Sequence, residues 1–204
     1  NNVFNRRRLE ELGGLGSLRT SDLPDLMGIE EKKLIQYIYP NEKELAQVGI
    51  MGIFLGYYFP WDGEKNAEIA AKHGFMTYHK DVEGSIVSYE NLDNLQMRIH
   101  DYFKFLKYGF DRVTDWCSIH IRRERMQREE AIEIAREKGG KYPDEYLGVK
   151  LEEVLKEIGC DKKRFDEICN IFTNKKLFKL DPSGIPIRDN HNNLIKINYD
   201  NINE

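Results

Sequence analysis

Residues 91–108 carry the sequence NLDNLQMRIHDYFKFLKY, and Gly109 follows directly. Apolar side chains recur in this stretch at the three- and four-residue spacing of one helix face: Leu92, Leu95, Ile99, Tyr102 and Leu106. A glycine after the last turn is a common C-terminal stop for a helix. The stretch therefore predicts an amphipathic helix over residues 91–108 that packs its apolar face against a core.

Further helices are predicted along the rest of the chain. They span residues 29–39, 41–49, 63–73, 115–126, 128–138, 149–158 and 161–172. Asn41 and Glu44 have the spacing of a capping box. Asp62 and Asp161 stand where helix N-caps are expected. The chain is therefore expected to be mainly α, with a helical C-terminal subdomain.

Residues 50–58, IMGIFLGYY, form the best candidate strand. The run is short, nearly continuous in apolar residues and contains glycines, which favours a strand buried on both faces. A single strand cannot satisfy its backbone donors and acceptors alone. We therefore expect its neighbouring strands to lie upstream or in another chain.

The composition is that of a soluble globular protein. Of the 204 residues, 40% are hydrophobic and 32% are charged, and no apolar run approaches the roughly 20 residues that span a bilayer. Cys117, Cys160 and Cys169 show no CxxC pairing, so neither a disulfide framework nor a zinc ribbon is expected. No secretory leader is visible, so a cytoplasmic location is predicted, and the start at Asn1 indicates a fragment.

Positive charge is concentrated in one segment of an acidic chain. The net charge is −4, yet residues 98–128 hold eight basic residues against four acidic ones. A local basic field favours phosphate or carboxylate ligands over bulk nucleic-acid binding, so nucleic acid is not an expected partner. A solvated helix face is the alternative interpretation.

The basic segment supplies the first candidate site. Its members lie around Gly109 and along the following helix: Lys104, Lys107, Arg112, Asp115, Ser118, Arg122 and Arg125. Basic side chains at such a corner could hold phosphate oxygens, while Asp115 fixes an arginine or a sugar hydroxyl. A salt-bridge cluster that only pins the two helices together is equally compatible with the pattern.

An aromatic stretch after the candidate strand supplies the second site. Tyr57, Tyr58 and Trp61 could stack a base or sugar ring, and Asp62 could bind its hydroxyl groups. The alternatives are core aromatics and a helix N-cap. The signatures GxxxxGK(S/T), GxGxxG, HExxH and GxSxG are absent, and the histidines lack metal-ligand spacing, so no metal site is expected.

Several motifs, in order and spacing, carry a resemblance to a known family. They are LGYYFPWD at 55–62, DYFKFLKYGF at 101–110, RVTD at 112–115, IR at 121–122, RM at 125–126 and REEA at 128–131. Over residues 21–178 the chain resembles the bacterial N-acetyl sugar amidotransferases, which belong to the ATP-pyrophosphatase (PP-loop) enzymes. The resemblance implies a Rossmann-like α/β fold, of which this chain is the C-terminal half.

The implied architecture divides the chain into three parts. Residues 1–74 would end the α/β nucleotide-binding-type domain, and residues 75–178 would form a helical substrate-binding subdomain. Residues 179–204 would be a polar tail or a weak hairpin. The family's Ser-Gly-Gly-x-Asp-Ser pyrophosphate loop is absent, so this polypeptide alone is not expected to hydrolyse ATP.

The resemblance also implies an activity. It is the ATP-dependent conversion of a sugar N-acetyl group to an acetamidino group, in lipopolysaccharide O-antigen or flagellin glycan biosynthesis. ATP with Mg²⁺ would activate the amide oxygen of a sugar or nucleotide-sugar, and ammonia from a glutaminase and a cyclase-like subunit would displace AMP. Lys107, Arg112 and Asp115 would be catalytic, and the other residues of the two candidate sites would bind substrate.

Three positions depart from the family pattern. Asp111 and Glu124 stand where the family tends to have glycine, and His120 stands where it tends to have aspartate. Extra acids beside the arginines would weaken anion binding, which leaves open a changed substrate or a less active paralogue. The alternative functions are a PP-loop enzyme acting on tRNA, as in thiolation, and a non-catalytic helical interaction module.

Overall fold

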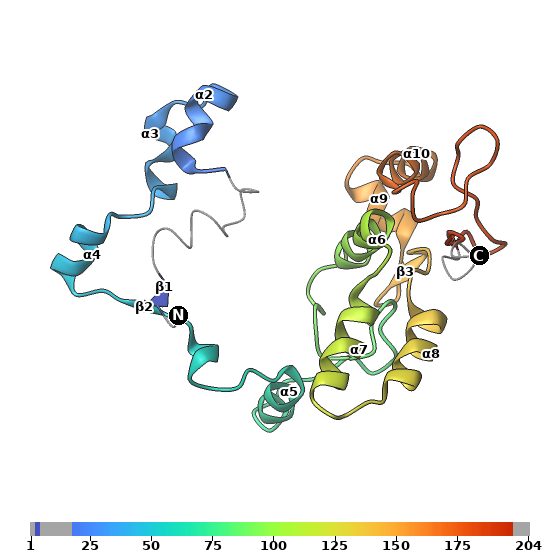
Figure 1. Cartoon of the computed structure of the whole chain (residues 1–204), viewed down its shortest axis with the longest axis horizontal. Coiled ribbons are helices and arrows are strands. Elements are labelled where there is room, and N and C mark those ends of the chain that lie inside the picture. The colour runs from blue at the N-terminus through green and yellow to red at the C-terminus, as the bar shows by residue number, and fades with distance from the viewer. Residues whose placement is uncertain (1–2, 5–17, 198–204) are drawn as a thin grey trace, which may run out of the picture. The chain divides into compact units, whose positions relative to one another are not determined.

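The computed structural model describes residues 3–4 and 18–197 (Figure 1). The chain divides into two compact units, with the boundary between Asn66 and Ala67. The described residues are mainly helical and form two short two-stranded sheets. The predicted mainly α character and the helical C-terminal subdomain are thus confirmed, while the three-part division at residues 74 and 178 stays a prediction.

The first unit consists of short elements joined by loops. In chain order, with η for a 3₁₀ helix, they are β1 (Val3–Phe4), η1 (Thr20–Asp22), α2 (Leu23–Met27), α3 (Glu31–Leu34), η2 (Ile35–Tyr37), α4 (Glu42–Val48), β2 (Gly52–Ile53) and η3 (Leu55–Tyr57). The backbone N–H groups of Asn41 and Glu44 each donate to the other residue's side chain at 3.0 Å. This contact confirms the predicted capping box at the start of α4.

The strand predicted over residues 50–58 is shorter and more exposed than expected. Only β2 is strand, and it pairs with β1 in an antiparallel two-residue ladder. Ile50, Met51 and Leu55 are 59%, 70% and 60% exposed. A strand is buried on both faces only where strands flank it and helices cover it, and within the described residues of this unit β2 pairs with β1 alone.

The second unit contains the longer helices. After α5 (Gly63–Ala71), which begins before the boundary, come α6 (Met97–Tyr108), α7 (Arg112–Arg122), α8 (Arg128–Lys138), β3 (Glu145–Tyr146), β4 (Val149–Lys150), α9 (Leu151–Glu157) and α10 (Lys162–Phe172). The predictions for 128–138 and 161–172 are confirmed, and Asp161 caps α10 by accepting from Arg164 N at 2.7 Å. Residues 149–150, predicted as helix, instead pair with β3.

The start of α6 differs from the prediction. Asn91 adopts a left-handed φ of 56°, and the Asn94 side chain accepts from the backbone N–H of Gln96 at 2.9 Å. These local turns delay the helix to Met97. Its end is as predicted, since Gly109 closes α6 with a φ of 76°.

The bounds of α7 are also shifted, toward the N-terminus. The Asp111 side chain accepts from the backbone N–H of Val113 at 3.1 Å and so acts as an N-cap. The helix therefore begins at Arg112 and includes the predicted start at Asp115. It ends at Arg122 because the chain turns at Glu124, which has a φ of 57°.

Helix α6 supplies the centre of the main core. Its Tyr102, Phe105 and Leu106 are between 0% and 6% exposed. They belong to one cluster with side chains of the loop after α8, of α9 and α10, and of the C-terminal segment: Tyr142, Leu151, Leu155, Phe165, Cys169, Phe178 and Leu194. Helices α6 and α10 lie side by side, and α7 packs on α8 (Figure 1).

Segment 177–197 folds back on itself and on α6. Antiparallel bridges join Phe178 to Lys196, Leu180 to Pro186 and Arg188 to Leu194. Arg188 Nη1 donates to the Tyr102 hydroxyl at 2.8 Å. Burial raises the pKa of Tyr102 to about 12, so the hydroxyl stays neutral at ordinary pH. Residues 198–204 of the predicted tail lie outside the described residues.

Candidate functional site

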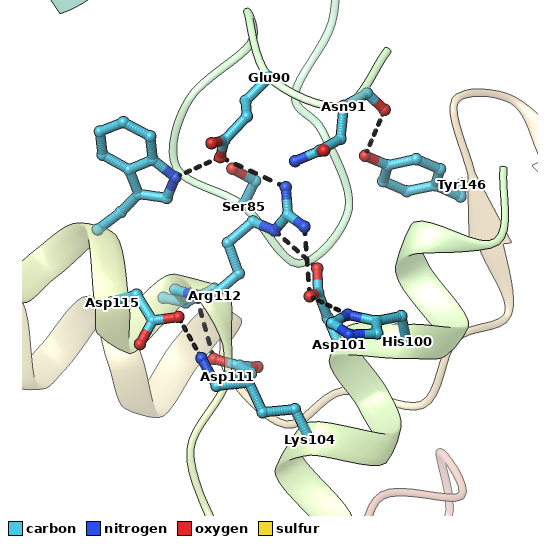
Figure 2. Close-up of polar contacts among 12 residues, drawn as sticks. Ser85, Glu90, Asn91, His100, Asp101, Lys104, Asp111, Arg112, Asp115 and Tyr146 are labelled. Atoms are coloured by element: carbon cyan, nitrogen blue, oxygen red, sulfur yellow. Dashed lines mark hydrogen bonds and ion pairs between the residues drawn. The ribbon is translucent and has the colours of Figure 1, made fainter. Parts of the chain in front are cut away.

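The corner between α6 and α7 brings residues of the basic segment together. Gly109 ends α6, and Asp111 caps α7 two residues later, so the turn is short. Arg112, the first residue of α7, consequently faces α6. Figure 2 shows its guanidinium between the carboxylates of Glu90 and Asp101.

Arg112 is held by these two carboxylates. Its Nε donates to Asp101 Oδ2 at 2.7 Å and its Nη2 to Asp101 Oδ1 at 3.3 Å, a two-point contact. Its Nη1 donates to Glu90 Oε2 at 3.3 Å. The side chains of Arg112 and Asp101 are only 11% and 10% exposed. The charge of Arg112 is therefore matched inside the protein.

Glu90 also ties the preceding loop to its neighbours. The same Oε2 atom accepts from the indole N–H of Trp116 at 2.8 Å, one turn along α7 from Arg112. On the other side, the Tyr146 hydroxyl of β3 donates to the Asn91 carbonyl at 3.1 Å (Figure 2). The loop around residue 90 is thus fixed to both α7 and β3.

Lys104 and Asp115 form a second ion pair between the same two helices. Their side chains are 26% and 44% exposed, so this pair is in contact with solvent. The Lys104 ammonium also lies 4.8 Å from the centre of the Phe110 ring. Unlike Arg112, these two side chains are accessible to a ligand.

The other predicted members of the first site lie elsewhere. Lys107 is exposed, with its ammonium 4.8 Å from the centre of the Phe172 ring. Ser118 donates to a carbonyl one turn back in its own helix at 2.8 Å. Arg122 ends α7 and Arg125 follows it, and both are exposed. The structure therefore brings together only part of the predicted set.

The aromatic candidate site belongs to the first unit. Tyr57, Tyr58 and Trp61 are 66%, 50% and 73% exposed, so they are not core residues of the described chain. The rings of Tyr57 and Tyr58 meet edge-on with centroids 5.4 Å apart. Asp62 is buried and accepts from the backbone N–H of Glu64 at 3.2 Å, which agrees with the N-cap interpretation.

A comparison with known protein families finds one family whose model covers most of the second unit. The family model described as LPS biosynthesis protein WbpG-like, C-terminal domain, matches residues 74–189. The chain belongs to this family. The match covers the whole α6–α7 corner with both ion pairs, and it confirms the predicted relationship to lipopolysaccharide biosynthesis. No curated protein matches the chain.

Asp111, one of the three departures from the family pattern, has a structural role in this WbpG-like domain. Besides capping α7, it accepts through Oδ2 from the backbone N–H of Gly140 at 2.7 Å, which ties the corner to the end of α8. The residue is 2% exposed. Burial raises the pKa of Asp111, against the opposing effect of these N–H donors and of the Arg98 charge. Its carboxylate is thus engaged by backbone donors.

The other two departures from the family pattern are Glu124 and His120, at the end of α7. Glu124 holds a left-handed φ of 57°, a conformation that glycine adopts more readily, which explains why a glycine suits this position. The ring of His120 lies 5.9 Å from the ring of Trp116, centre to centre, on the same helix.

Sequence reasoning missed the two carboxylates that hold Arg112. A signal existed for Asp101, because it precedes Arg112 by eleven residues, the same separation as between Lys104 and Asp115. When two pairs of oppositely charged residues have the same sequence separation on either side of a glycine turn, the pattern indicates ion pairs between the two helices. Glu90 gave no such signal, since it lies in a loop outside both helices.

The described residues contain no metal-ligand cluster, and two of the three cysteines are buried. Within residues 3–4 and 18–197, no group of three His, Cys, Asp or Glu side chains is placed to hold a metal ion. The thiols of Cys117 and Cys169 are buried, which raises the pKa of both, to about 12 for Cys169. None of the described helices combines the length and apolarity needed to cross a bilayer.

Proposed function

We propose that this chain is the substrate-binding part of an ATP-dependent amidotransferase that converts a sugar N-acetyl group to an acetamidino group for the lipopolysaccharide O-antigen. The observation that carries the proposal is the WbpG-like match over residues 74–189. The motifs at 101–110 and 112–115, which resemble the sugar amidotransferases, lie inside this match and build the α6–α7 corner.

The proposed reaction needs activation, because an amide oxygen is a poor leaving group. ATP would adenylate that oxygen with release of pyrophosphate, ammonia would then attack the amide carbon, and AMP would leave with the oxygen. The sequence lacks the pyrophosphate loop and the described residues hold no metal-ligand cluster, so no residue here is assigned to ATP or Mg²⁺. A glutaminase and a cyclase-like subunit are the proposed ammonia source. The role of this chain is to bind and orient the sugar.

The α6–α7 corner contains residues with two different proposed roles: one positions the helices, and the others can contact a substrate. Arg112 is enclosed by two carboxylates and acts by fixing α6 against α7. Asp115 and Lys104 are partly exposed, so their ion pair can open toward a ligand. An ionised carboxylate accepts from sugar hydroxyls, and an ammonium donates to them. The exposed ammonium of Lys107 is a further candidate for substrate contact.

The test uses the complete natural enzyme with its ammonia source, and measures acetamidino sugar and AMP together. Asp115→Asn keeps the shape of the side chain and removes its charge, so kcat is expected to fall about 10²-fold. Asp93→Asn changes an exposed carboxylate before α6 and serves as the matched control. Wild-type turnover by a folded Asp115→Asn enzyme would remove the corner from the active site. A wild-type enzyme that forms neither product would refute the amidotransferase proposal itself.

A further inference from the structure

A cavity of about 420 Å³ lies beside the α6–α7 corner, within the second unit. Three regions distant in sequence line it: residues 105–114, the end of α8 with residues 139–141, and residues 189–196. Its volume falls within the range of about 300–1,000 Å³ that is usual for small-molecule sites. Phe105, Ile132 and Leu194 give it an apolar wall.

Three cations line this cavity: Arg136, Lys141 and Lys196. Within the described residues, none of them forms an ion pair with a carboxylate, although the charge of Asp111 acts on Lys196 from a longer distance. Lys196 Nζ donates to the Gly109 carbonyl at 2.5 Å and lies 5.0 Å from the centre of the Phe105 ring. Burial lowers the pKa of Lys196, and the charge of Asp111 opposes this effect only in part.

The two acids that line the cavity are engaged by neutral donors instead. Asp111 accepts from Val113 N and Gly140 N at 3.1 and 2.7 Å. Asp189 accepts from the backbone N–H groups of His191 and Asn193 at 2.8 and 2.9 Å, and these donors hold its pKa below the usual range. Neither carboxylate makes an ion pair with the cavity cations in the described part of the chain.

The backbone around Lys141 is fixed, so the cation is presented from a defined place. The buried Arg98 donates through Nη2 to the Lys141 carbonyl at 2.7 Å. Gly140 adopts a φ of 68°, and a side chain there would overlap the Phe105 ring. The glycine thus lets the chain pass close to the apolar wall and bring Lys141 to the cavity.

We propose that this cavity binds the anionic group of a small molecule, a carboxylate or a phosphate, through Arg136, Lys141 and Lys196. A bound anion would form the ion pairs that these cations do not make with carboxylates of the described chain, and charge-assisted hydrogen bonds are the strong ones in proteins. The apolar wall accommodates the neutral part of the molecule. The cavity and the basic corner have no cation in common. The proposal is therefore independent of the amidotransferase reaction.

The test is to titrate the full chain with each of four probes and to measure binding by calorimetry. The probes are inorganic phosphate, glucose 6-phosphate, glucuronate and neutral glucose. Saturable binding is expected for at least one anionic probe and not for glucose. Preference for glucuronate identifies a carboxylate site, and preference for either phosphate probe identifies a phosphate site. Absence of saturable binding by all three anions would refute the proposal.

A matched pair of variants ties the binding to the cavity. Arg136→Gln with Lys141→Gln removes two exposed cavity cations and is expected to weaken the anion at least tenfold. Arg128→Gln with Lys163→Gln removes the same charge from exposed positions elsewhere on α8 and α10, and is expected to keep the wild-type affinity. Equal weakening by both pairs would show a general charge effect and overturn the assignment to the cavity.

Discussion

Two groups of cations in the second unit differ in what surrounds their charges. At the corner, Arg112 and Lys104 each meet a carboxylate of the neighbouring helix. At the cavity, Lys196 meets a carbonyl and an aromatic ring, and Arg136 and Lys141 make no ion pair within the described residues. A concentration of basic residues in a sequence therefore indicates a helix-pinning corner as readily as a binding site.

The two groups of cations should also differ in how much they contribute to the free energy of unfolding. A buried ion pair adds little net stability, because desolvation offsets the attraction between its charges, but loss of one partner leaves an uncompensated charge inside. An exposed cation without a partner contributes almost nothing to folding. Stability measurements can therefore distinguish the two groups before any ligand is known.

The largest expected effect is the loss of Arg112. Arg112→Leu leaves Asp101 and Glu90 without their cation, and we expect the free energy of unfolding to fall by about 3–5 kcal/mol. Chemical denaturation of the full chain measures it. Arg122→Gln, at the exposed end of the same helix, is expected to stay within about 0.5 kcal/mol of wild type. A similar small change for both would mean that the corner is not held by the buried pair.

A smaller effect is expected at the cavity wall. Gly140 and Gly159 share a φ of 68°, but an added Cβ meets the Phe105 ring at Gly140 and open space at Gly159. Gly140→Ala should therefore lose about 1–3 kcal/mol more than Gly159→Ala, from overpacking alone. Thermal unfolding of both variants compares them. Equal losses would show that the Phe105 ring can move aside and that the wall is not rigid.

The smallest effect on stability is expected from the cavity cations. The combined Arg136→Gln and Lys141→Gln change should alter the free energy of unfolding by no more than about 0.5 kcal/mol per substitution, because both side chains are exposed and without ion pairs in the described chain. Denaturation in low and high salt measures it. A loss comparable to that of Arg112→Leu would erase the distinction between the two groups.

Local signals in the sequence predicted most of the helical architecture. The glycine at 109 and the caps at Asn41 and Asp161 mark helix ends that the structure confirms. The start of α6 was missed because the left-handed conformation of Asn91 leaves no trace in the apolar pattern. The strand at 50–58 was overestimated because apolar composition alone does not distinguish a covered strand from exposed apolar chain.

The candidate site was less predictable, because its pairs are tertiary. The salt-bridge interpretation of the basic corner agrees with the contacts of Arg112, yet its partner Glu90 lies in a loop with no regular spacing to either helix. The cavity joins residues near 110, 140 and 195, which no local pattern connects. The sequence-predicted catalytic roles of Lys107, Arg112 and Asp115 stay predictions.

The position of segment 177–197 has a consequence for the order of folding. Its contacts from Lys196 to Gly109 and from Arg188 to Tyr102 close loops of 87 and 86 residues. Contacts between helices close in sequence form before such long loops close, because closure entropy must be overcome first. The helices can therefore assemble on a nascent chain before residues 188–196 complete the cavity. Anion binding would then report that the whole unit has reached its final fold.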